Sequence, residues 1–161
     1  MDSFDILLFL HIAAVIVALG ATFSYPFLQG FAERKGVAAT RLVFQAVERI
    51  EKFLVFPGGA LVFIFGLGLI MTSEAPNDYR KEMPAWLTIA IVWYLVTYAA
   101  AYFVQRKQIR RAIAVLEGVP DSPDLPAAYV PIGKRIQMVA GLIGVSILGI
   151  ALLMVLGPSG S

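Results

Sequence analysis

The only histidine in the chain, His11, is the one side chain that could bind a metal or carry a proton near neutral pH. It lies in a long apolar run, where a neutral imidazole can ligate haem iron, transfer a proton or form a hydrogen bond to a neighbouring helix. A second axial haem ligand could come from Met71, Met154 or the His11 of a second copy. The sequence therefore marks His11, Met71 and Met154 as candidate haem ligands and His11 as the candidate for any other metal, and it leaves a packing role open.

Three tyrosines, Tyr94, Tyr98 and Tyr102, recur every four residues in a later apolar run, with Trp93 beside the first. On a helix they form one stripe, which could be a wall of a flat hydrophobic ligand site. The same stripe is typical of helix packing, with the hydroxyls bonded to a neighbouring helix. We keep Tyr94 and Tyr98 as candidate cofactor-binding residues and interpret Tyr102 as an interface anchor.

The sequence lacks the residues that several classes of chemistry require. The chain has no cysteine, so it offers no disulfide and no thiolate nucleophile. One histidine cannot supply a two-histidine metal motif, and no Ser/His/Asp set can be assembled. The long apolar runs contain no Asp, Glu, Lys or Arg, which counts against an ion-coupled transporter. The sequence predicts no catalytic residues.

Membrane-spanning helices must position these side chains, because 59% of the 161 residues are hydrophobic and only 15% are charged. Four uncharged runs are each about 20 residues or longer, enough for a helix to cross a hydrocarbon core of about 30 Å. We expect spans at about residues 6–30, 53–73, 84–105 and 134–157 of a single domain. A soluble bundle would need charged outer faces, which these runs lack. The predicted fold is an all-α integral membrane four-helix bundle.

The first run separates into two faces when it is placed on a helix. Small and polar side chains recur at steps of three and four residues and form one stripe: His11, Ala14, Ala18, Thr22, Tyr25 and Gln29. Bulky side chains lie on the opposite face: Phe9, Ile16, Phe23 and Phe27. We expect the stripe to face protein and the bulky face to face lipid.

Basic residues gather in two connections, residues 31–52 and residues 106–133. The first contains Arg34, Lys35, Arg41, Arg49 and Lys52, and the second contains Arg106, Lys107, Arg110 and Arg111. The short N-terminal segment carries only acidic charges, Asp2 and Asp5. Because positive loops stay on the cytoplasmic side, we expect both connections to be cytoplasmic and both termini to lie outside.

The second and third spans are expected to extend into the cytoplasm as helices. The second begins near Thr40, and the third continues to Leu116 before a glycine and proline stop. If the two form an antiparallel hairpin, Glu48 and Glu51 reach the depth of the basic residues at 106–111. We expect interhelical ion pairs there, each worth at most about 1 kcal/mol because the site is exposed to water.

Proline and glycine predict two local features of these helices. The stretch Phe56-Pro57-Gly58-Gly59 predicts a kink, because proline removes a backbone donor and clashes with the preceding turn. In the last span, Ala140, Gly141, Gly144 and Ala151 form a small-residue face that would let another helix approach closely.

Three short stretches carry a resemblance to known families: Leu10-His11, Gly20-Ala21-Thr22-Phe23-Ser24-Tyr25-Pro26, and Pro57-Gly58-Gly59. With them the chain resembles an uncharacterised bacterial family of small predicted integral membrane proteins with four spans. The start of the first span is also similar to the first helix of HemJ-type protoporphyrinogen oxidases and of the copper resistance protein D family. The HemJ resemblance implies haem binding at His11. That family also relies on basic residues in or beside the membrane, and the first span here has none, so the resemblance does not extend to the oxidase activity.

The sequence as a whole favours a structural or accessory module of the bacterial inner membrane, without enzymatic activity. We expect it to lie in the lipid bilayer and to act as a homo-oligomer or in a larger membrane complex. We expect no nucleic-acid partner. The alternative is a haem-b protein with His11 as axial ligand, which could be redox active. A small-molecule or metal-resistance channel is a third hypothesis, and it depends on the copper-family resemblance alone.

Overall fold

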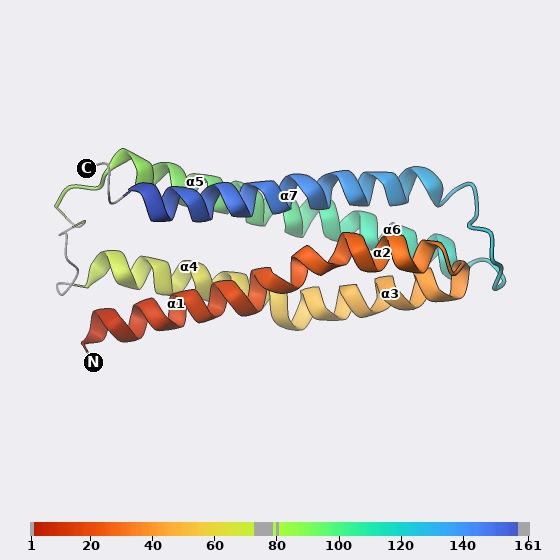
Figure 1. The fold of residues 1–161 in the computed structure, drawn as a ribbon, viewed down its shortest axis with the longest axis horizontal. Coiled ribbons are helices and arrows are strands. Elements are labelled where there is room, and N and C mark those ends of the chain that lie inside the picture. The colour runs from red at the N-terminus through yellow and green to blue at the C-terminus, as the bar shows by residue number, and fades with distance from the viewer. Residues whose placement is uncertain (1, 73–78, 80, 158–161) are drawn as a thin grey trace.

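The computed structural model describes residues 2–72, 79 and 81–157, and all regular secondary structure in these residues is helical (Figure 1). Four helices are long and apolar enough to cross a membrane: Ser3–Glu33, Val37–Met71, Ala85–Glu117 and Val130–Leu156. Each contains most of one predicted apolar run, which confirms the all-α membrane fold. The predicted end of the second span, at residue 73, lies outside the described residues.

Three of these four helices change helix type partway along. The first consists of α1 (Ser3–Gly20), a 3-10 turn η1 (Ala21–Ser24) and α2 (Tyr25–Glu33). The second consists of α3 (Val37–Ile50), a π turn η2 (Glu51–Val55) and α4 (Phe56–Met71). The third consists of α5 (Ala85–Ala99), a π turn η3 (Ala100–Gln105) and α6 (Arg106–Glu117). The fourth, α7 (Val130–Leu156), is unbroken.

A proline follows the irregular turn of the second helix. Pro57 has no N–H for the carbonyl one turn earlier, and its ring would clash with that carbonyl in a regular α-helix. The chain forms a π turn over Glu51–Val55, which ends two residues before the proline. The kink predicted at Phe56-Pro57-Gly58-Gly59 stays a prediction: the π turn precedes this stretch, and Phe56–Met71 is regular α-helix.

The helices form two halves with different packing (Figure 1). In the apolar half, α1 packs against α4, and α5 packs against the C-terminal part of α7. In the amphipathic half, α3 packs against α2 and α6, and the N-terminal part of α7 packs against α6. The second and third helices do extend beyond their apolar runs, as the sequence predicts.

The hydrophobic core lies in the amphipathic half, not in the apolar one. Its buried side chains include Val37, Phe44, Val47, Ile109, Ala112, Ile113, Leu116, Tyr129 and Ile136. By contrast, in the most apolar window of the first helix only 6% of the residues are buried within the chain, and the share is also 6% in the last helix. Helices in lipid need no buried apolar core, because the acyl chains solvate their side chains. The apolar half is built for that solvent.

Two helices begin earlier than the sequence suggests. The second starts at Val37 rather than near Thr40, because Gly36 turns the chain with a φ of 93° and Val37 donates its N–H to Ser122 O at 2.9 Å. The fourth starts at Val130 rather than near residue 134. Pro131 lies in its first turn, where the missing N–H costs no hydrogen bond.

The small-residue face predicted for the last span is only partly used for packing. Gly141 and Ala151 are exposed, while Gly144 meets the ring of Phe23. Closer approaches lie instead at Gly149, where a Cβ would lie 2.6 Å from Cη2 of Trp93, and at Gly157, where a Cβ would meet the ring of Trp86. In each pair the bulky indole of α5 requires the glycine, and neither pairing is visible as a repeat in either helix.

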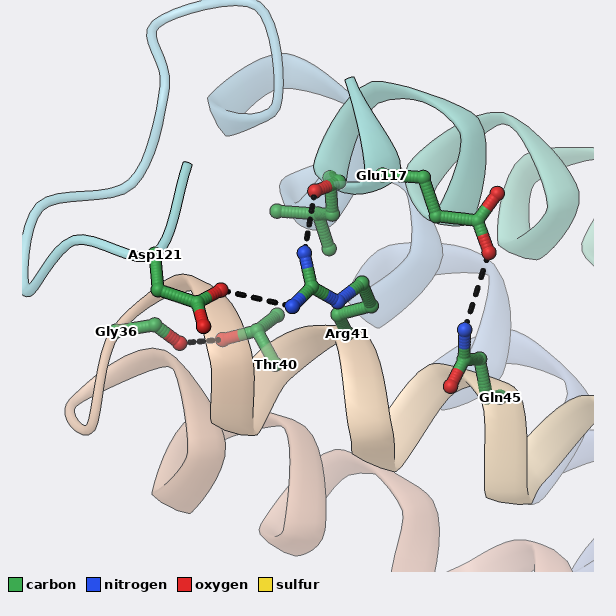
Figure 2. Close-up of polar contacts among 7 residues, drawn as sticks. Gly36, Thr40, Arg41, Gln45, Glu117 and Asp121 are labelled. Carbon is green, nitrogen blue, oxygen red and sulfur yellow. Dashed lines mark hydrogen bonds and ion pairs between the residues drawn. The ribbon is translucent and has the colours of Figure 1, made fainter. Parts of the chain in front are cut away.

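Polar contacts fix α3 to the C-terminal end of α6 (Figure 2). Arg41 donates to Leu116 O at 3.2 Å and to Asp121 Oδ1 at 2.7 Å, and Gln45 donates to Glu117 Oε1 at 3.0 Å. The arginine thus supplies a donor for a carbonyl in the last turn of α6, where the helix has none of its own.

The predicted hairpin between the second and third spans is present. Arg110 Nε donates to Glu48 Oε1 at 2.8 Å, which is one of the predicted ion pairs. Glu51, the other predicted partner, forms no ion pair within the described part of the chain and is buried. The reason is its place on the inward face of α3 and η2, in register with Phe44, Val47 and Val55.

Candidate functional site

The stripe on the first helix lies against protein, as its spacing predicts. Ala18, Tyr25 and Gln29 are buried, and His11, Ala14 and Thr22 are half-buried. The bulky residues of the opposite face are all exposed: Phe9, Ile16, Phe23 and Phe27. The imidazole therefore points to a neighbouring helix, and that helix is α4.

His11 is held by the backbone of α4. Its Nδ1 lies 2.9 Å from Val62 O, and because a carbonyl only accepts, Nδ1 must carry the proton. In the neutral ring Nε2 then keeps its lone pair, and this is the form that binds a metal. Gly66 makes room for the ring, since a Cβ there would lie 3.1 Å from Cε1 of His11.

The two candidate methionines lie in different helix pairs. Met71 is 63% exposed on α4, five residues beyond Gly66, which is about 7.5 Å further along the helix. Met154 is 36% exposed on α7, which packs along α5. Of the two, only Met71 shares a helix pair with His11.

Tyr94 and Tyr98 also bond to α4. Tyr94 donates to Gly59 O at 2.7 Å, and Tyr98 donates to Phe56 O at 2.9 Å. Gly59 admits the tyrosine rings, since a Cβ there would lie 2.7 Å from Cε2 of Tyr98. Together with the bond from His11, these contacts make α4 the helix to which both α1 and α5 attach.

Three further polar residues, Tyr25, Glu51 and Gln105, form a site that the sequence reading missed. They are only 8%, 5% and 4% exposed, and each has an oxygen without a hydrogen-bond partner in the described residues: Tyr25 OH, Glu51 Oε2 and Gln105 Oε1. Each lies at an irregular turn, directly after η1, at the start of η2 and at the end of η3. We call these three residues the polar centre.

Charges and rings surround the polar centre. Glu51 interacts electrostatically with both Tyr25 and Arg106. The Arg106 guanidinium lies 5.2 Å from the centroid of the Tyr102 ring and 5.8 Å from that of Phe56. The cation is therefore stabilised by aromatic faces beside the carboxylate.

A small cavity of about 10 Å³ adjoins the polar centre and is lined in part by Tyr25, Gln29, Gln105 and Ile136. This volume is about the minimum for one water molecule. A water there can accept from the Tyr25 hydroxyl and donate to Gln105 Oε1, so the arrangement suits hydration of a buried polar site. Among the described residues, no three His, Cys, Asp or Glu side chains gather as metal ligands would.

One sequence signal could have revealed the burial of Glu51. It follows Val47 by four residues and precedes Val55 by four, which places it on the inward face of its helix. Its negative charge instead suggested a partner among the basic residues of the third span. Gln105 offered a similar signal, because it precedes the buried Ile109 by four residues in the regular helix after the π turn.

A second buried polar group joins α2 to the start of α7. Tyr129 donates to Glu33 Oε1 at 2.7 Å, and Gln29 Nε2 donates to the same oxygen at 2.7 Å and to Gly133 O at 3.0 Å. Burial, followed by the hydrogen bond to Glu33, raises the pKa of Tyr129 above its ordinary value. The polar atoms of this group have hydrogen-bond partners, and the group joins α2 to α7.

Fold and site define an all-α, multi-pass integral membrane protein in which His11, Tyr94 and Tyr98 bond within the bundle. The chain belongs to the family described as predicted integral membrane protein (DUF2269), whose family model matches residues 5–158. No curated protein and no solved structure matches it. The likeness of its first helix to HemJ-type oxidases and copper resistance protein D remains a prediction from Leu10-His11.

Proposed function

We propose that this protein is a structural or accessory module of the bacterial inner membrane, without a catalytic centre of its own. One observation supports this above the others: His11, Tyr94 and Tyr98 all bond to backbone carbonyls of α4. A side chain used in this way joins helices, and its polar group is not aimed at a substrate. In this proposal both termini lie outside, and residues 31–52 and 106–133 lie in the cytoplasm.

The proposal includes assembly as a homo-oligomer or within a larger membrane complex. The outward side of α7 supports it, because a Cβ built at Gly141 meets nothing within 4 Å. Small residues on a lipid-facing helix let a second helix approach backbone to backbone. The first and last helices also have little surface buried within the chain.

Single cysteines test the assembly cleanly, because the chain contains none. In nanodiscs, a Gly141→Cys variant should form disulfide-linked dimers, while Val92→Cys, exposed on α5, should not. Light scattering should give a mass above that of one chain. A monomeric mass together with no cross-link at position 141 would remove the homo-oligomer.

Haem-b binding at His11 is the second candidate function. It is favoured by the Nδ1–H bond to Val62 O, since such a bond to a carbonyl orients a ligating imidazole and raises its basicity. His11 Nε2 would hold the iron. Met71, Met154 or the His11 of a second copy would supply the second protein ligand. A haem so held supplies electron transfer, and the chain's part is to orient the imidazole.

An absorption spectrum separates the two candidate functions. Protein purified after haem supplementation should show no Soret band if it is a structural module. A Soret band that disappears in His11→Ala would overturn that proposal in favour of haem binding. Met71→Leu and Met154→Leu serve as matched variants, and a shifted band in one of them would identify the second ligand.

A further inference from the structure

An open groove of about 480 Å³ lies on the outer surface of the third long helix, at the junction of η3 and α6. Its walls are two aromatic and four basic side chains: Tyr102, Phe103, Arg106, Lys107, Arg110 and Arg111. We call it the basic groove. It is separate from the residues that bond to α4 and from the cavity beside the polar centre.

The basic groove lies where a bilayer would end. From Ala85 to Gln105 the helix is uncharged and rises about 30 Å, the thickness of a hydrocarbon core. The first basic residue, Arg106, follows at once. Phe103 is 69% exposed at the apolar edge of the groove, so the aromatic rings lie on the acyl side and the cations on the headgroup side.

The charges in the groove are only partly neutralised by the protein. Arg110 pairs with Glu48, and Arg106 lies against aromatic rings and interacts electrostatically with Glu51. Lys107 and Arg111 are exposed, stand four residues apart on one face, and form no ion pair with any described residue. Arg41 of α3, by contrast, is committed to Asp121. The groove therefore keeps a net positive charge.

We propose that the basic groove binds the headgroup of an anionic phospholipid. Guanidinium and ammonium groups donate strong charge-assisted hydrogen bonds to phosphate oxygens, and basic pockets beside a membrane helix suit anionic headgroups. Lys107 and Arg111 supply the free donors, and Phe103 contacts the first acyl carbons. The same cations could hold free phosphate, so the test must separate the two ligands.

The test measures binding of phosphatidylglycerol to the full chain in neutral detergent micelles. Phosphatidylglycerol should bind, and phosphatidylcholine should not compete with it. A Lys107→Gln/Arg111→Gln double variant should weaken binding by about fivefold for each charge removed. Lys134→Gln/Arg135→Gln, which removes an exposed basic pair at the start of α7, is the matched control and should leave the affinity unchanged.

Phe103→Ala separates lipid from free phosphate, because it leaves every charge in place. It should weaken phosphatidylglycerol binding without changing the affinity for inorganic phosphate. Equal losses in the two double variants would overturn the proposal by showing non-specific attraction. Displacement of the lipid by inorganic phosphate at similar concentrations would also overturn it, and would make the groove a phosphate site.

Discussion

The contact between α1 and α4 makes the sharpest prediction about stability. A Cβ added at Gly58 would lie 2.6 Å from Cβ of Ala18, which is fully buried. Neither methyl can rotate away, so the helices would have to separate by about 0.8 Å to reach the ordinary contact distance of 3.4 Å. Overpacking of this kind costs about 1–3 kcal/mol. Gly58→Ala should therefore destabilise the apolar half.

Gly30→Ala in α2 is the matched control, because the same chemical change there meets no atom within 4 Å. The intrinsic gain in helix propensity, about 1 kcal/mol, is then similar in both variants and cancels in their difference. Reversible unfolding in mixed micelles should show Gly58→Ala less stable than Gly30→Ala by about 1–3 kcal/mol. Adding Ala18→Gly removes the clashing methyl and should restore most of the loss. Equal stability of the two alanine variants, or no rescue by Ala18→Gly, would refute this packing.

Three further changes test the polar contacts. Tyr98→Phe should cost about 1 kcal/mol of unfolding free energy, because it removes the bond to Phe56 O, and Tyr102→Phe should cost less, since no hydrogen bond of its hydroxyl is described. Glu51→Gln should leave stability unchanged or raise it, because it removes a buried charge and keeps the shape; a loss above about 1 kcal/mol would contradict the burial seen here. The pKa of Tyr129 is raised in the folded state, so the unfolded side chain ionises first when the pH rises above about 10, and stability should fall there. Thermal unfolding between pH 8 and 11 should show a smaller loss of stability for Tyr129→Phe than for the unsubstituted protein.

Much of the fold can be read from residue spacing. The alternation of His11, Ala18, Tyr25 and Gln29 with bulky residues places the first helix correctly, because a 3.6-residue period holds along it despite the short 3-10 turn. The lengths of the uncharged runs predict four membrane-length helices, because about 20 helical residues cross a hydrocarbon core.

What spacing could not give is how the helices meet. The pairing of Trp93 with Gly149 depends on which helices are neighbours, and a single glycine carries no record of its partner. The two π turns each add a residue to a turn, so the phase read from one side of the turn fails on the other. A hydrogen bond from a side chain to a backbone carbonyl, such as that from His11 to Val62 O, does not depend on the side chain of the acceptor residue, so the sequence does not identify the acceptor.

The polar centre lies where the two halves of the molecule join, and this place has a physical consequence. Apolar side chains in lipid resist the sliding of one helix along another only weakly, because successive helix turns offer similar apolar contacts. Tyr25, Glu51 and Gln105 come from three different helices, and a slide of one turn, about 5.4 Å, would separate them. Buried polar groups of this kind are best known for specifying register rather than for adding stability. We infer that the joint burial of the three polar side chains, rather than hydrogen bonds among them, favours one alignment of the three helices at the level where each departs from regular α-helix.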